Sequence, residues 1–99
     1  KSRIPAEIEE AVHKHPAVAE VGVIGVSDAL RGEVLKAFIV LKPDAALTDQ
    51  DIKQFCRQHL AHFKIPHTVV FVESLPKTRT GKIDKAALRQ NDVRTGERR

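Results

Sequence analysis

The residues best suited to chemistry lie in one polar stretch, Leu-Pro-Lys-Thr-Arg-Thr-Gly-Lys-Ile-Asp-Lys at positions 75–85. Its Gly-Lys pair is not a phosphate-binding P-loop, because that motif needs glycine at Pro76 and serine or threonine at Ile83. What remains is a loop with Lys82 at its tip, behind Gly81, which allows close approach to a ligand. A lysine ammonium can meet a phosphate and a carboxylate together as charge builds between them. Composition alone favours the alternative, an ordinary solvated basic loop.

A second charged segment, Arg31-Gly32-Glu33, lies between two apolar runs and could contact another domain, although such turns are usually only solvated. The five histidines show no spacing typical of a ligand set, so we expect surface or capping roles for them. The single cysteine, Cys56, has no disulfide partner and no zinc-ligand neighbours. We therefore predict no metal site and a reducing, cytoplasmic setting.

The net charge of +4 is unevenly distributed along the chain. Residues 1–76 contain 9 Lys and Arg against 10 Asp and Glu, whereas residues 77–99 contain 8 against 3. A basic segment can bind nucleic acid or an anionic cofactor. With four Phe and no Tyr or Trp, the chain lacks a set of aromatic residues for base stacking, which argues against nucleic acid. No apolar run approaches the length of a membrane span, about 20 residues.

The length of 99 residues allows one domain with a modest core. Apolar spacing and turn residues predict the order helix, strand, strand, helix, strand, helix. Thr48 and Asp51 form an expected capping box at the start of the second helix. The expected elements span residues 6–15, 18–26, 34–41, 48–60, 68–72 and 85–90. This order predicts an α+β fold, a small three-stranded sheet with helices packed on it. We assign residues 1–90 to the domain and residues 91–99 to a flexible basic tail.

Several short motifs together resemble the C-terminal domain of AMP-forming acyl-CoA synthetases, members of the adenylate-forming superfamily that includes luciferases and peptide-synthetase adenylation domains. The resemblance rests above all on Leu-Pro-Lys-Thr-Arg-Thr-Gly-Lys-Ile-Asp at 75–84. It is strengthened by Pro-Ala-Glu-Ile-Glu at 5–9, His-Pro-Ala-Val at 15–18, Asp-Ala-Leu-Arg-Gly-Glu at 28–33 and Lys-Ala-Phe-Ile-Val-Leu at 36–41. These motifs occur in the family's order, and their wording resembles short- and medium-chain acyl-CoA synthetases most.

The resemblance implies a mobile domain that supplies the adenylation lysine, Lys82, to a large N-terminal domain of the same enzyme. Gly81, Thr80 and Lys77 would support the lysine's loop. Interdomain or CoA-side contacts would come from Arg31, Gly32, Glu33, Ser2 and Arg3. The family's glycine-bearing loop is not found before Ile4, and positions 1–3 resemble the residues that usually precede that glycine.

The implied reaction converts a carboxylic acid, ATP and CoA into acyl-CoA, AMP and pyrophosphate, with Mg²⁺ accompanying the nucleotide. We expect the isolated chain to be inactive, because an active site for these substrates needs more concave surface than the chain offers. Two alternatives stay open. The acyl group could pass to a carrier protein, or the chain could be a stand-alone interaction or regulatory module.

Overall fold

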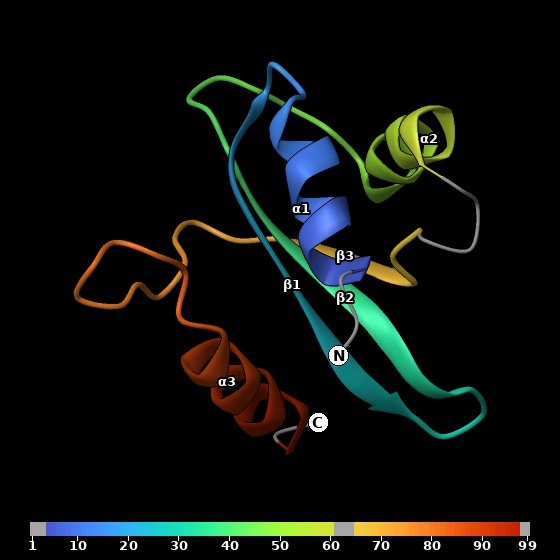
Figure 1. Cartoon of the computed structure of the whole chain (residues 1–99), viewed down its shortest axis with the longest axis vertical. Coiled ribbons are helices and arrows are strands. Elements are labelled where there is room, and N and C mark those ends of the chain that lie inside the picture. The colour runs from blue at the N-terminus through green and yellow to red at the C-terminus, as the bar shows by residue number, and fades with distance from the viewer. Residues whose placement is uncertain (1–3, 61–64, 98–99) are drawn as a thin grey trace.

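In the part of the chain that the structure describes, three helices and three strands follow one another in the predicted order (Figure 1). The computed structural model describes residues 4–60 and 65–97, and side chains as far as residue 91. The elements are α1 (Ile4–His13), β1 (Val18–Asp28), β2 (Gly32–Leu41), α2 (Asp49–His59), β3 (Thr68–Phe71) and α3 (Lys85–Glu97). The predicted α+β class, a three-stranded sheet with packed helices, is confirmed.

The sheet has the strand order β1-β2-β3 and mixes two kinds of pairing. β1 and β2 form a long antiparallel hairpin, with register from Val18 opposite Leu41 to Asp28 opposite Gly32. β3 runs parallel to β2, and Lys36 pairs with Thr68. Parallel neighbours need a crossover connection, and here the connection contains α2.

Each face of the sheet carries its own apolar cluster, because successive side chains of a strand point to opposite faces. On one face, α1 and α2 pack through Ile8, Val12, Ile52 and Cys56 against Val21, Val23, Ala37 and Ile39. On the other face, Leu75 and Leu88 pack with Ile24 and Phe38. The second cluster brings the segments on both sides of the 76–83 stretch onto the sheet.

The start of α2 has the capping box that the sequence predicts. The hydroxyl of Thr48 accepts the Asp51 N–H at 3.1 Å, and the Asp51 carboxylate accepts the Thr48 N–H at 2.9 Å. The same helix buries Cys56 completely. Burial raises the pKa of the Cys56 thiol to about 11, so the group stays protonated at neutral pH and belongs to the core.

The last helix is longer than the sequence predicts. The expected end near Gln90 is wrong, because α3 continues to Glu97. The segment after Leu88 has little apolar periodicity, so pattern analysis gave no reason to extend the helix. The assignment of residues 91–99 to a flexible tail stays a prediction, and residues 98–99 lie outside the described part of the chain.

Candidate functional site

The stretch from Lys77 to Ile83 is a tight hairpin and not an irregular loop. Lys77 and Ile83 form an antiparallel bridge at its base. The Thr78 N–H donates to the Lys82 carbonyl at 2.7 Å, and the Gly81 N–H donates to the Thr78 carbonyl at 3.0 Å. Gly81 has φ = 89°, the left-handed conformation that closes hairpins with a glycine bulge. Glycine adopts this conformation without the steric cost of a Cβ.

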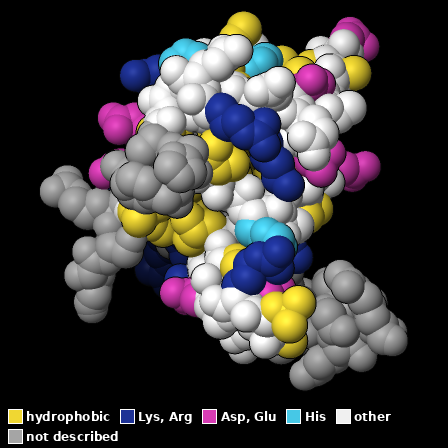
Figure 2. Space-filling model, turned by 90° about the vertical axis from the view of Figure 1, so that its right-hand side faces the viewer, with side chains coloured by type: hydrophobic (Ala, Val, Ile, Leu, Met, Phe, Trp, Pro, Cys, Tyr) yellow, Lys and Arg dark blue, Asp and Glu magenta, His cyan; other side chains and the backbone are white. Residues whose placement is uncertain are grey.

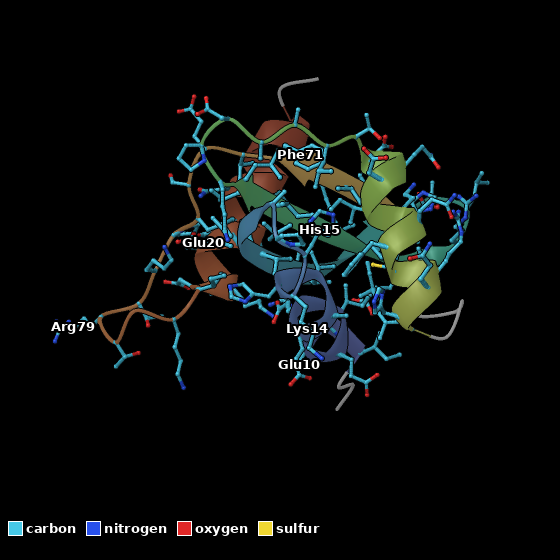
Figure 3. The ribbon with its side chains drawn as sticks, turned by 90° about the horizontal axis from the view of Figure 1, so that it is seen from above. Glu10, Lys14, His15, Glu20, Phe71 and Arg79 are labelled. Atoms are coloured by element: carbon cyan, nitrogen blue, oxygen red, sulfur yellow. The ribbon has the colours of Figure 1, made fainter. Side chains whose placement is uncertain are left out.

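This geometry corrects the expected place of Lys82. Arg79 and Thr80 occupy the turn, whereas Lys82 lies on the returning arm, next to the bridge. Figure 3 shows Arg79 at the outer end of the segment, far from the sheet. The side chains of Thr80 and Lys82 are exposed, and the Thr80 hydroxyl lies 3.0 Å from that of Thr78. The hairpin thus presents Lys82 to solvent on a short, hydrogen-bonded support.

Apolar contacts hold both ends of the hairpin on the sheet. Leu75, just before it, is buried, and Ile83, the bridge residue of the returning arm, packs on the cluster that contains Leu88. Gly22 on β1 makes room for this packing, since a Cβ there would lie 3.2 Å from Leu88 and 3.3 Å from Ile83. Asp84 then starts α3, and its carboxylate accepts the Ala87 N–H at 3.0 Å. The base of the hairpin is therefore part of the core.

Among the described residues, some of the basic side chains between positions 77 and 85 form ion pairs with the body of the domain, and others do not. Lys77 Nζ lies 2.8 Å from Glu20 Oε2 on β1. Lys85 Nζ lies 2.6 Å from Glu9 Oε2 on α1. Within residues 4–60 and 65–91, neither Arg79 nor Lys82 forms an ion pair. Lys77, predicted to support the loop, therefore contacts the body of the domain through Glu20.

Of the other predicted residues, Arg31 lies in the turn between β1 and β2, and Gly32 and Glu33 are the first two residues of β2. Asp28 holds this turn, because its Oδ2 accepts the Arg31 N–H at 2.9 Å and the Leu30 N–H at 3.1 Å. Gly32 has φ = 83°, again left-handed. The hydrogen bond from Arg31 is the main reason why the pKa of Asp28 lies below its ordinary value.

The structure does not bring this turn together with the Lys82 hairpin. The two segments leave the molecule at separate places (Figure 1). Leu30 at the turn is 90% exposed, the one large hydrophobic residue so exposed among those that the structure describes. Sequence analysis did not single it out, although an apolar residue in a polar turn was a visible signal. Ser2 and Arg3, also predicted as contacts, lie outside the described residues.

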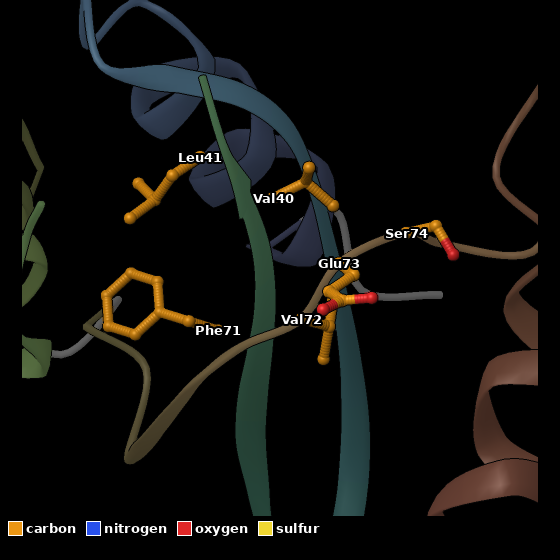
Figure 4. Close-up of a pocket in the computed structure, with 6 residues that line it drawn as sticks. All are labelled: Val40, Leu41, Phe71, Val72, Glu73 and Ser74. Carbon is orange, nitrogen blue, oxygen red and sulfur yellow. The ribbon is translucent and has the colours of Figure 1, made fainter. Parts of the chain in front are cut away.

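The rest of the surface carries mixed charges and an open hollow. Figure 2 shows basic and acidic side chains interspersed on the side that carries α2 and the β1–β2 turn. An open hollow near the ends of β2 and β3 is lined by Val40, Leu41, Phe71, Val72, Glu73 and Ser74 (Figure 4). In the described ranges, no group of His, Cys, Asp or Glu is arranged to hold a metal ion.

The fold and the hairpin define a small α+β domain with an exposed lysine on a projecting hairpin. Residues 7–82 match the family described as AMP-binding enzyme C-terminal domain. The chain therefore belongs to this family, and the match ends at Lys82 itself.

Proteins similar to this chain in sequence and in structure support this family assignment. The chain is 49% identical over 86 residues to the mitochondrial medium-chain acyl-CoA ligase ACSF2 of Rattus norvegicus, covering 87% of this chain and 14% of the relative. A fatty acyl CoA synthetase of Mycobacterium tuberculosis superimposes with a TM-score of 0.84 and 40% identity, over 92% of this chain and 18% of that one. ATP-bound MatB of Rhodopseudomonas palustris gives a TM-score of 0.81 and 36% identity, over 88% and 17%. The chain thus spans less than a fifth of the length of these proteins.

The sequence also predicts that the chain has no membrane span and lies in the cytoplasm. No helix in the described part of the chain is long and apolar enough to cross a membrane. The rat relative is described as mitochondrial, so similarity to known proteins does not support the cytoplasm in particular.

Proposed function

We propose that this chain is the mobile C-terminal domain of an AMP-forming acyl-CoA synthetase and that Lys82 acts in its adenylation step. The observation that carries the proposal is the hairpin of residues 77–83. It holds Lys82 exposed and without an ion pair among the described residues, inside the family match. A solvated basic loop would need neither the left-handed Gly81 nor buried anchors on both sides.

In the proposed adenylation step, a carboxylate oxygen of the acid bonds to the α-phosphorus of ATP while the bond to the departing pyrophosphate breaks. Negative charge is redistributed between carboxylate and phosphate during this step. The Lys82 ammonium would lie close to both and stabilise that charge. The large N-terminal domain would supply the pockets for ATP and the acid, because this chain spans only 14% to 18% of its relatives.

The cofactors of the proposed enzyme are ATP, Mg²⁺ and CoA. Exposed cations on the hairpin fit an anionic nucleotide, and a structural relative is described with ATP bound. The part of this domain that the structure describes has no acidic cluster for Mg²⁺, so we infer that the ion arrives with the nucleotide and is held by the other domain. The ion would neutralise phosphate charge there.

CoA is the proposed acceptor, because the rat relative is described as an acyl-CoA ligase, which favours CoA over a carrier protein. The β1–β2 turn, with Arg31 exposed beside Gly32 and Glu33, is our candidate for CoA-side or interdomain contacts. We keep Ser2 and Arg3 as predicted contacts on the same grounds of resemblance. A large domain preceding this one in the gene would exclude the alternative of a stand-alone module. The cytoplasm stays our prediction for the compartment.

The test replaces Lys82 with alanine in the full-length enzyme and measures both half-reactions. Removing a preorganised charge from a transition state typically slows a reaction by about 10²–10³. We expect acyl-AMP formation to slow by about this factor, while thioester formation from supplied acyl-AMP stays nearly unchanged. Lys14→Ala, an exposed lysine on the α1 side (Figure 3), is the matched control and should leave both steps intact. Small, equal effects of the two changes would refute the role of Lys82.

A further inference from the structure

Two glutamates far from the hairpin in sequence meet the two lysines that flank it. Glu20 on β1 pairs with Lys77 at the incoming arm, 57 residues along the chain. Glu9 on α1 pairs with Lys85, the first residue of α3. The hairpin is therefore bracketed by an ion pair before Lys82 and another after it. No family motif quoted above predicts either contact.

The carboxylate of Glu9 is itself fixed by the sheet. Its Oε2 accepts the Val23 N–H at 2.8 Å as well as the Lys85 ammonium at 2.6 Å. β1 is an edge strand, so the Val23 N–H needs a partner outside the ladder. One carboxylate oxygen thus joins α1, the edge of the sheet and the start of α3. The side chains of Glu9 and Lys85 are 22% and 34% exposed, so the pair is partly shielded from water.

The second pair holds the incoming arm of the hairpin itself, through Lys77. Lys77 and Glu20 are 37% and 34% exposed, and their side-chain atoms approach to 2.8 Å. Figure 3 shows Glu20 on the side of the sheet from which the hairpin leaves, with Arg79 at the far end. Among the described residues, the hairpin beyond the Lys77–Ile83 bridge has only local hydrogen bonds. Its direction relative to the sheet therefore depends on the anchors at its base.

We propose that Glu9 and Glu20 are positioning residues, which set the direction in which the hairpin carries Lys82 into the partner domain. The proposal rests on the adenylation role of Lys82 given above. Individual exposed ion pairs are weak. One pair holds Lys77 on the incoming arm, and the other holds Lys85, two residues beyond the bridge. Together they restrict rotation of the hairpin, since turning it about its base stretches at least one pair. Small misplacements of a catalytic group cost much rate, so a weak restraint can still be measurable.

The test uses the full-length enzyme with Glu9→Gln, Glu20→Gln and the double variant. Glutamine keeps the size and an acceptor oxygen for the Val23 N–H but removes the charge. We expect acyl-AMP formation to slow up to about fivefold for each single change, the range of an exposed ion pair. The double variant should slow it by about tenfold, with the KM for the acid unchanged, if the two pairs act on one hairpin. Thioester formation from supplied acyl-AMP should stay within about twofold.

Glu10→Gln is the matched control, because Glu10 is exposed on the same helix and forms no ion pair with the described residues. A charge swap gives a second check. Glu20→Lys should slow acyl-AMP formation, and adding Lys77→Glu should restore it, which a general loss of stability would not allow. In the 99-residue chain itself, amide order parameters of Thr80 and Gly81 should fall in the double variant.

Two results would overturn the proposal. In one, the double variant matches Glu10→Gln in acyl-AMP formation. In the other, both half-reactions fall together and the charge swap does not restore them. Lys82→Ala, measured alongside, separates this failure from failure of the proposed function. If Lys82→Ala slows adenylation and the glutamate variants do not, only the positioning role is lost.

Discussion

At the scale of single residues, Gly81 matters because its backbone conformation places the next residue, Lys82, to which we assign the proposed chemistry. Its φ of 89° is unfavourable for any residue with a Cβ, although a Cβ there would meet no atom within 4 Å. We therefore expect Gly81→Ala to lower the free energy of unfolding by about 1–2 kcal/mol, through backbone strain and not through a steric clash. The Lys82 arm should be displaced, and acyl-AMP formation in the full-length enzyme should slow. The measurement is the rate of that half-reaction beside the free energy of unfolding.

Gly32→Ala provides the control, because Gly32 has nearly the same φ, 83°, and an equally open surrounding. It should lower the free energy of unfolding by a similar amount but slow acyl-AMP formation less than Gly81→Ala does, because Gly32 belongs to the segment proposed for CoA-side or interdomain contacts and does not support Lys82. If both glycine variants slow that step equally, strain in general, and not displacement of Lys82, would explain the result.

The sequence identifies some of these residues and misses others for a physical reason. Lys82 and Gly81 stand out because a glycine before a lysine in a polar stretch is a local pattern. The partners of Lys77 and Lys85 lie 57 and 76 positions away along the chain, and no local pattern encodes such contacts. Lys77 was accordingly assigned to the loop without its partner, Glu20. The exposure of Leu30 is likewise not encoded by a spacing pattern, since single apolar residues are common on protein surfaces.

At the scale of elements, the β1–β2 turn offers a prediction about pH. The pKa of Asp28 is lowered, chiefly because the Arg31 N–H donates to its carboxylate. Partial burial opposes this shift, whereas the Leu30 N–H and the Arg31 charge reinforce it. A carboxyl group with a lowered folded-state pKa stabilises the fold above its unfolded pKa, about 3.9. This stabilisation is lost as the pH falls through the lower, folded value. The turn should therefore weaken below about pH 4.

The measurement compares thermal unfolding of the wild-type chain and Asp28→Ala across this range. At neutral pH the variant should melt at a lower temperature, because two turn N–H groups lose their acceptor. The difference should shrink as the pH falls below about 4, where the wild-type carboxyl group also becomes protonated. A difference that stays constant down to the lowest pH would show that the charge of Asp28 contributes nothing.

The order of the elements was predictable because each strand and the first two helices carry clear apolar periodicity or a cap, such as Thr48 at α2. Two features of the elements could not be predicted from the sequence. The end of α3 lies in a segment with one apolar residue, Val93, so there was no periodic face to follow. The 77–83 hairpin contains no alternating apolar residues, and its only local signal was the Thr-Gly pair at its turn.

At the scale of the whole molecule, apolar packing on both faces of one sheet connects the hairpin to the core. Ile8, Val12 and Ile52 lie in the cluster on one face, and Leu75 and Leu88 lie in the cluster on the other. Gly22 lets the second cluster approach β1 closely. A well-packed body with a projecting lysine suits the proposed docking of this domain as a unit, because the base of the Lys82 hairpin is fixed to that body.

The same architecture predicts that the 99-residue chain alone folds but does not catalyse. Two buried clusters and a sheet paired over most of β1 and β2 should give one cooperative unfolding transition. Exchange of pyrophosphate into ATP should be absent with any carboxylic acid, because the pockets for nucleotide and acid belong to the proposed large domain. Adding the separately purified large domain should restore measurable exchange with the wild-type chain and much less with Lys82→Ala. Exchange by the chain alone would show that it holds a complete site, and would refute the division of labour proposed here.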